Sequence, residues 1–290
     1  MPYLYLVGAV LTMSSMNLLS GFFNRKNNEK KDPVALYNLI YILIVFAAWT
    51  IKFLLKPDFD AGVLWYSMAF GISFALATIG MTMGMKLGSV TLTSLMIQLS
   101  TIMATIWGFF FWNAKFTLLV ALGLALVVVS MWLCLYKGKE ADKGVPITWK
   151  WFIFAMMGFL GNAGCTIIQR SQQIAYSGKY GDMLMMFAMT VAVAIFVFQY
   201  VRSDKTDTST MLKTSSWIPA LSGLSNVAMN VFVMLLATAP ISSSIVYPVI
   251  AVGGLATVSL FSLFVFKEKL FWWQWLGIVV GAVAVALLSL

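Results

Sequence analysis

The residues of this sequence that could bind a ligand are amides and a tyrosine set within long apolar runs. Asn17 lies in the first run, Asn162 in the sixth, and Asn226 and Asn230 share the eighth. Amides both donate and accept hydrogen bonds, which suits a neutral or zwitterionic polar solute. An amide that faces lipid is costly, so these side chains should face protein or a water-filled cavity. The candidates for lining a substrate cavity are Asn17, Gln98, Asn162, Asn226, Asn230 and Tyr247.

The same side chains also have a simpler interpretation, as hydrogen bonds between helices worth about 0.6 kcal/mol each on average. We favour it for the serines and threonines of the runs and leave both interpretations open for the amides. Ser222, Asn226 and Asn230 follow one another at intervals of four, which places them on one stripe of a helix. This pattern predicts that Asn17, Asn162, Asn226 and Asn230 converge on one cavity near the middle of the membrane.

The interiors of the apolar runs contain no acidic residue and no histidine. All ten acidic residues lie in loops or at the ends of runs, and the chain has no histidine. A carboxylate within the membrane would indicate a proton relay or a cation partner, so its absence argues against proton coupling through a central acid. No metal or cofactor site is expected, and an enzyme would lack a buried acid, base or metal cluster. The two cysteines lie in apolar runs, and no disulfide is predicted.

Two arginines close corresponding runs in the two halves of the chain. Arg25 follows Asn24, and Arg170 follows Gln169. One interpretation is anchoring of the helix ends at the membrane interface. The other is a guanidinium at the mouth of a cavity, where it would attract an anionic group. Arg25 and Arg170 are therefore candidates for the cavity mouth.

The composition places the whole chain in a membrane. Of 290 residues, 61% are hydrophobic and only 10% are charged, whereas soluble domains carry about 25% charged residues. A helix needs roughly 20 apolar residues to cross the hydrocarbon core. Open backbone groups have no partner in lipid, so the runs must be helices. The ten predicted spans are 3–23, 33–53, 62–85, 88–112, 115–136, 149–170, 183–201, 215–238, 241–266 and 271–289.

The polar stretch 137–150 divides the spans into five and five. We expect a first repeat over 1–138, a linker loop over 139–148 and a second repeat over 149–290. Asn17 and Asn24 are seven residues apart, as are Asn162 and Gln169. Lys115 and Gly123 are separated by eight residues, as are Lys269 and Gly277. Because five is odd, the second repeat enters from the opposite side, as in the inverted repeats of secondary transporters.

One stretch resembles a known transporter family. The segment 247–270, YPVIAVGGLATVSLFSLFVFKEKL, resembles the last two helices of the small multidrug resistance proteins, and PYLYLVGAVLTM resembles their first helix. Ten helices made of two such units resemble the EamA-type branch of the drug/metabolite transporter superfamily. The resemblance implies alternating access through a central cavity. Where the small multidrug resistance proteins have a membrane glutamate, this chain has Met13.

These observations together predict an all-α membrane protein that acts as a secondary transporter. We expect it to move a small polar organic metabolite across the cytoplasmic membrane, the plasma membrane of a bacterium, by alternating access. The expected partners are the small-molecule substrate and the lipid bilayer, with no nucleic acid and no cofactor. The alternative is a multidrug exporter of lipophilic cations, in which Tyr247 and Trp107 would supply cation–π contacts.

The distribution of basic residues predicts the orientation. Of the 19 Lys and Arg residues, 14 fall in the odd-numbered loops of the predicted ten-span chain, counted from the N-terminus. The positive-inside rule then places those loops in the cytoplasm and both chain ends outside. A C-terminal reporter that is active only in the cytoplasm should be silent, while the same reporter inserted in 137–150 should be active. A strong C-terminal signal would reverse the orientation.

Overall fold

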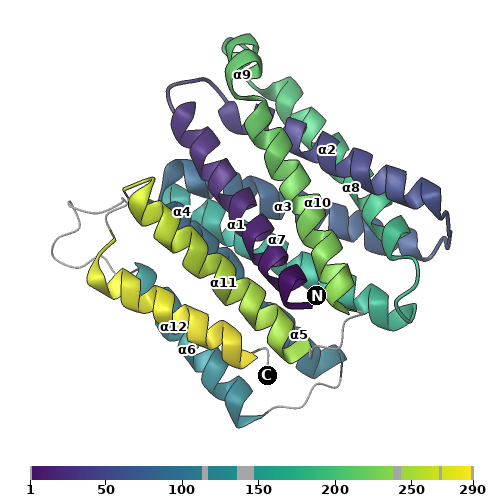
Figure 1. The fold of residues 1–290 in the computed structure, drawn as a ribbon, viewed down its shortest axis with the longest axis vertical. Helices are drawn as coiled ribbons and strands as arrows, with labels where there is room; N and C mark the ends of the chain where they lie inside the picture. Colours follow the sequence, from purple (N-terminus) through teal and green to yellow (C-terminus); the bar gives the residue numbers. More distant parts are fainter. Residues whose placement is uncertain (1, 113–116, 136–146, 238–242, 268–269, 289–290) are drawn as a thin grey trace.

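In a computed structural model, the chain is a bundle of helices (Figure 1). The structure describes residues 2–112, 117–135, 147–237, 243–267 and 270–288, and among these it contains no strand. The helices are α1 Pro2–Lys26, α2 Pro33–Leu55, α3 Val63–Leu87, α4 Val90–Gln98, α5 Thr101–Phe111, α6 Leu118–Leu135, α7 Trp149–Ala175, α8 Gly181–Arg202, α9 Thr208–Ser215, α10 Trp217–Ala237, α11 Ser243–Phe264 and α12 Trp272–Leu288.

The lengths and compositions of these helices fit a multi-pass membrane protein. Six segments are long and apolar enough to cross a bilayer, namely Tyr3–Lys26, Pro33–Leu55, Val63–Leu87, Val90–Phe111, Trp149–Ala175 and Gly181–Arg202. Four shorter apolar segments lie in α6, α10, α11 and α12. Many large apolar side chains point outward, among them Phe110, Phe198 and Phe264. Such a surface suits lipid tails, because they are as apolar as the side chains themselves.

Two details differ from the expected spans. The run predicted over 88–112 is divided into α4 and α5 at Leu99 and Ser100, and the stretch expected as a loop after Arg202 holds the short helix α9. Side chains that the sequence analysis did not single out cap the starts of two helices. The hydroxyl of Ser89 accepts a hydrogen bond from the Leu92 amide at the start of α4. Thr148 does the same for the Trp151 amide at the start of α7.

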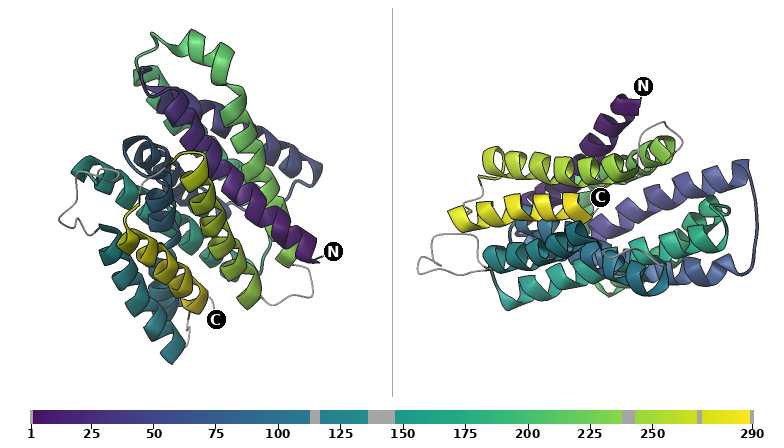
Figure 2. Two further views of the ribbon diagram at one scale, coloured as in Figure 1. Left: turned by 60° about the vertical axis from the view of Figure 1, so that its left-hand side comes forward. Right: turned by 90° about the horizontal axis from the view of Figure 1, so that it is seen from below.

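The bundle is built from a few extensive helix pairs. α3 lies along α7, α1 along α10, and α6 along α12. α8 packs against both α2 and α3. Figure 2 shows α11 and α12 side by side on one face, with α7 and α8 on the other side of the bundle.

The contact between α3 and α7 depends on residues without bulky side chains. A β-carbon added at Gly80 would overlap the backbone of Gly158, and one added at Gly161 would overlap the backbone of Ala77. The two helices therefore touch through their main chains, as helices with small residues do in membranes. A β-carbon added at Gly281 of α12 would likewise meet the side chains of Leu95 and Ser130.

We expect Gly80→Ala to destabilise the protein although alanine favours a helix. The methyl group must push α7 away, and overpacking of this kind costs about 1–3 kcal/mol, more than the gain in helix propensity of up to about 1 kcal/mol. Gly181→Ala is the matched control, because nothing lies near the position of its added β-carbon. Thermal unfolding of the purified protein in detergent should show a lower Tm for the first variant alone. Equal Tm values would mean that α3 and α7 can separate without cost.

Candidate functional site

Two groups of polar side chains inside the bundle include methionines of α1. The Met16 cluster consists of Met16, Tyr37, Tyr41, Ser222, Asn226 and Asn230. The helix-break cluster consists of Met13, Ile97, Gln98, Ser100 and Asn162. Met13 and Met16 are one turn apart, so α1 brings the two clusters close together.

The Met16 cluster joins α1, α2 and α10. The Tyr37 hydroxyl donates to the Ser222 hydroxyl at 2.6 Å, and the Ser222 hydroxyl lies 3.4 Å from the main-chain oxygen of Met16. The amide nitrogen of Asn226 donates to the Met16 sulfur at 3.4 Å, and the Tyr41 hydroxyl reaches the same sulfur at 3.6 Å. Thioether sulfur is a weak acceptor, so these donors are held loosely and would gain from a better acceptor.

Within this cluster, α10 contributes its predicted stripe. The amide of Asn230 donates to the main-chain oxygen of Asn226 at 2.8 Å and lies 3.3 Å from its side-chain oxygen. Tyr41 also stacks on Phe74 with ring centroids 6.3 Å apart, and Phe74 stacks on Phe70 at the same distance. The polar cluster is therefore continued by a row of aromatic rings from α2 to α3. An organic solute would meet amides and hydroxyls on one side and ring faces on the other.

The helix-break cluster is formed around the interruption between α4 and α5. The Asn162 amide of α7 donates to the Ser100 hydroxyl at 2.8 Å and to the Ile97 carbonyl at 3.4 Å. The main-chain bonds tighten here, since the Ser100 amide donates to the Ile97 carbonyl at 3.2 Å and the Ile102 amide donates to the Leu99 carbonyl at 3.1 Å. Next to them, the Gln98 amide reaches the Met13 sulfur at 3.7 Å. Asn162 thus contacts a turn in which Leu99 and Ser100 keep right-handed helical angles.

The structure partly gathers the six predicted cavity residues. Asn226 and Asn230 lie together, and Gln98 lies beside the partners of Asn162, but the hydrogen bonds of Asn162 and of Asn226 belong to different clusters. Asn17 is buried in α1, next to Met16. Tyr247 lies on α11, and its side chain is outside the described part of the chain. The four asparagines are thus split between two clusters, and their convergence on one cavity remains a prediction.

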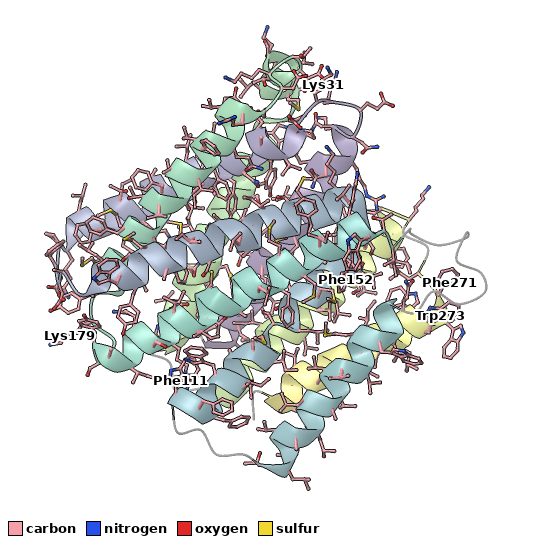
Figure 3. All side chains as sticks on the ribbon, turned by 180° about the vertical axis from the view of Figure 1, so that it is seen from behind. Lys31, Phe111, Phe152, Lys179, Phe271 and Trp273 are labelled. Carbon is pink, nitrogen blue, oxygen red and sulfur yellow. The ribbon has the colours of Figure 1, made fainter. Side chains whose placement is uncertain are left out.

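The two candidate mouth arginines lie at opposite ends of the bundle. The guanidinium of Arg25 lies 4.6 Å from the ring centre of Phe266, and its Nη1 donates to the Phe266 carbonyl at 2.8 Å. Arg170 lies 5.2 Å from the ring centre of Trp112. We call these the Arg25 end and the Arg170 end. Lys31 lies toward the first, and Phe111 and Lys179 lie toward the second (Figure 3).

At the Arg25 end, charged residues tie the loop after α1 to the loop after α8. Lys31 pairs with Asp204 at 3.0 Å, and Lys30 pairs with Asp207 at 3.6 Å. Hydrogen bonds from Thr206, together with the Lys31 ammonium, lower the pKa of Asp204 to about 2. Since the unfolded carboxyl has a pKa of 3.8, this tie is complete above about pH 4 and is lost as the pH falls through 2.

At the Arg170 end, a different set of contacts joins the loop after α2 to the loop after α7. Lys52 of α2 pairs with Asp182 of α8 at 2.8 Å. The rings of Tyr66 and Tyr176 meet edge to face with centroids 6.1 Å apart. The hydroxyl of Tyr176 also lies close to Gly62. Both ends of the bundle are thus crossed by contacts between a loop of the first half and a loop of the second.

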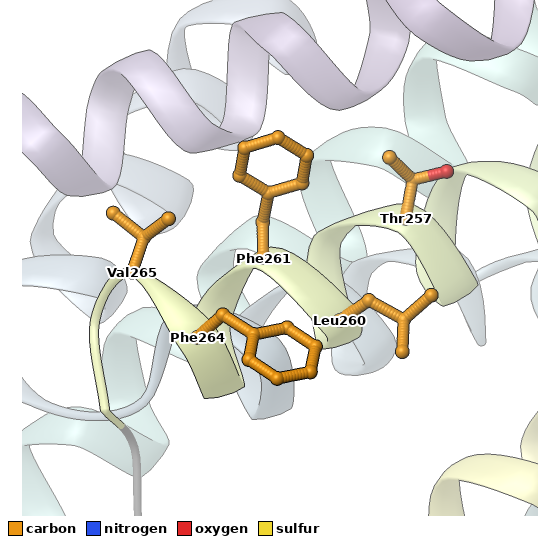
Figure 4. A pocket seen from close by; sticks show the side chains of 5 residues that line it. All are labelled: Thr257, Leu260, Phe261, Phe264 and Val265. Carbon is orange, nitrogen blue, oxygen red and sulfur yellow. The ribbon is translucent and has the colours of Figure 1, made fainter.

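Among the described residues, two surface hollows can be compared with the predicted cavity, and no predicted cavity amide lines either of them. One has a volume of about 370 Å³ and lies between the ends of α1 and α3, where Arg25 and Lys86 line it. The other, of about 260 Å³, is an apolar groove formed by Thr257, Leu260, Phe261, Phe264 and Val265 on one face of α11 (Figure 4). The described residues hold no group of three His, Cys, Asp or Glu that could bind a metal.

Sequence reasoning missed the tyrosines and methionines of these clusters. The helix α2, which the sequence predicts only as an apolar span, carries Tyr37, Asn38 and Tyr41. Two tyrosines four residues apart share a helix face, so their spacing was a usable signal. Met13 and Met16 gave no such signal, because a thioether in an apolar run is ordinarily a gap filler.

Comparison with known proteins supports the fold and does not identify a family. No protein-family model matches the chain, and no curated protein matches it. A solved structure, described only as the crystal structure of a protein, is similar to it with a TM-score of 0.57. The two sequences are 13% identical, and the match covers 96% of this chain and 95% of that one. The likeness spans nearly the whole bundle and shows the fold alone.

We expect Asn162→Leu to destabilise the bundle by about 1 kcal/mol. Leucine fills a similar volume but removes the donor to the Ser100 hydroxyl and one of the two donors to the Ile97 carbonyl. Thr166→Val is the control, because the Thr166 hydroxyl bonds only within its own helix, to the Asn162 carbonyl at 3.1 Å. Thermal unfolding in detergent should separate the two variants. An unchanged Tm for Asn162→Leu would show that Asn162 does not support the helix break.

Proposed function

We propose that this protein is a secondary transporter that moves a small polar organic metabolite across a cytoplasmic membrane by alternating access. The observation that carries the proposal is the meeting of neutral donors from α2, α4 and α10 on two sulfurs of α1. A thioether is a weak acceptor, so these bonds to sulfur add little to the packing of the helices. A polar solute would offer these donors oxygen acceptors, which bind them more strongly than sulfur does.

The proposal includes ten membrane spans arranged as two inverted repeats. Six long segments and four shorter ones supply the ten, with α4 and α5 together forming one span. The first repeat would comprise α1, α2, α3, α4 with α5, and α6, over 1–138. The second would comprise α7, α8, α10, α11 and α12, over 149–290. The segment 139–148 would link them.

The helix pairs support this division. If each helix is replaced by its counterpart in the other repeat, the α3–α7 pair becomes α10–α1 and the α3–α8 pair becomes α10–α2. Both resulting pairs are in contact, and α6–α12 and α2–α8 are converted into themselves. Arg25 and Arg170, which occupy matching places in the two repeats, lie at opposite ends, as inversion requires. Membership of the EamA-type branch of the drug/metabolite transporters is part of the same proposal.

Alternating access requires one end of the bundle to open while the other stays closed. At the Arg25 end, the ties between the halves are ion pairs with partly exposed side chains. Such pairs contribute about 0–1 kcal/mol each, so thermal motion can break them. At the Arg170 end, the tie combines the Lys52–Asp182 pair with aromatic contacts. The α3–α7 pair would move as a unit, because its close backbone contacts at Gly80 and Gly161 leave little room for sliding.

Binding of a solute to the native state raises its Tm, so a thermal-shift screen can find the substrate class. Polar metabolites should stabilise the purified protein, and Asn226→Leu should remove the shift while the Tm without ligand changes little. Counterflow of the labelled hit into liposomes would then establish transport. Stabilisation by lipophilic cations alone would favour the multidrug exporter. Specific turnover of a hit without its movement across the bilayer would reject the transporter.

We expect transport to be independent of protonation within the membrane. Coupling through a carboxylate needs a group whose charge alternates, and the acids of the chain lie outside the described apolar helix interiors. Asp182, at the start of α8, is already paired with Lys52. A pH gradient imposed on liposomes with clamped membrane potential should therefore drive no accumulation. Accumulation that disappears in Asp182→Asn or Glu268→Gln, while substrate still binds, would contradict the prediction.

A further inference from the structure

The hollow at the Arg25 end is a cationic site built by two helix ends. Asn24, Arg25 and Asn28 line it from α1 and the following turn, and Lys86 and Gly88 line it from the end of α3. Among the described residues that line it there is no carboxylate. Its volume of about 370 Å³ exceeds that of an ordered water, and its two cations and several amides are the donors that bind a phosphate.

An apolar groove approaches the same place along α11. Its wall ends at Val265, and the next residue, Phe266, holds Arg25 through its ring and its carbonyl. The groove side chains are well exposed, with Phe261 at 50% and Phe264 at 72% (Figure 4). The cationic hollow and the apolar groove thus meet at the end of α11. A phosphate group and a hydrocarbon chain have the chemistry to occupy them together.

We propose that the Arg25 end binds one anionic phospholipid, with its phosphate in the hollow lined by Arg25 and Lys86 and an acyl chain along the groove of α11. A soluble phosphate would explain the hollow but would leave the adjoining groove without a role. The basic loops place this end at the predicted cytoplasmic surface, where anionic lipids attract basic clusters and basic pockets between helices bind lipid head groups. The inference requires only that the bundle lies in a membrane, and it does not depend on the proposed transport of a solute.

The test is native mass spectrometry of the detergent-purified full chain with phosphatidylglycerol or phosphatidylcholine of the same acyl chains. Both lipids carry a phosphate, but only phosphatidylglycerol has a net negative charge. The wild-type protein should retain phosphatidylglycerol at least about fivefold more than phosphatidylcholine. Lys86→Gln should lower its retention about fivefold, and Arg25→Gln with Lys86→Gln about 25-fold, since each basic residue near a membrane contributes such a factor.

The matched control is Lys179→Gln with Lys213→Gln, which removes the same net charge from exposed positions outside the hollow. It should retain phosphatidylglycerol as the wild type does. Equal loss in this control, or equal retention of phosphatidylcholine, would overturn the proposal. Glycerol 3-phosphate, a soluble phosphate, is added as a competitor. If it displaces the lipid at micromolar concentration, the hollow binds a soluble anion instead. If the double variant does not fold, Lys86→Gln decides, because it leaves the Arg25–Phe266 contact in place.

Discussion

The structure depends on one constraint: a polar group within the membrane must find its partner inside the protein. Main-chain groups satisfy it by forming helices, and where a helix is interrupted another helix must supply the partner. Asn162 does so at the break between α4 and α5, through the Ile97 carbonyl and the Ser100 hydroxyl. The turn between α4 and α5 stays helical in its angles and tightens to bonds three residues apart, and Asn162 adds a donor to it from α7.

Close backbone packing and weak polar bonding divide the bundle into parts with different mechanical roles. The α3–α7 contact, at Gly80 and Gly158, joins two helices through their main chains. Around Met13 and Met16, the amides of Gln98 and Asn226 and the hydroxyl of Tyr41 each reach a methionine sulfur. A rigid pair can move as a unit, while weakly bonded donors can exchange their partners for those of a solute. This combination is what alternating access through the centre of the bundle requires.

The charges lie at the two ends and organise them differently. At the Arg25 end, lysines and aspartates join two loops by ion pairs, and Arg25 and Lys86 line a hollow at the membrane surface. At the Arg170 end, a single pair between Lys52 and Asp182 lies near tyrosine contacts. An end held by exposed ion pairs responds to salt and to acidic lipids, whereas aromatic contacts do not. The lipid proposed at the Arg25 end would therefore lie beside the ion pairs that the proposed alternating access would break.

Composition alone determined that the chain is a helical membrane protein, because so few charges cannot cover a soluble surface and lipid permits no open backbone. The sequence also placed the helix ends, since Pro33, Gly88 and the charged turns stop or start helices by local chemistry. It could not show that Tyr37 and Tyr41 face α1, that Asn162 supports a helix break, or that Asn162 and Asn226 belong to different clusters. Those facts depend on which faces of distant helices meet, and that is decided by side-chain packing in three dimensions rather than by periodicity along one helix.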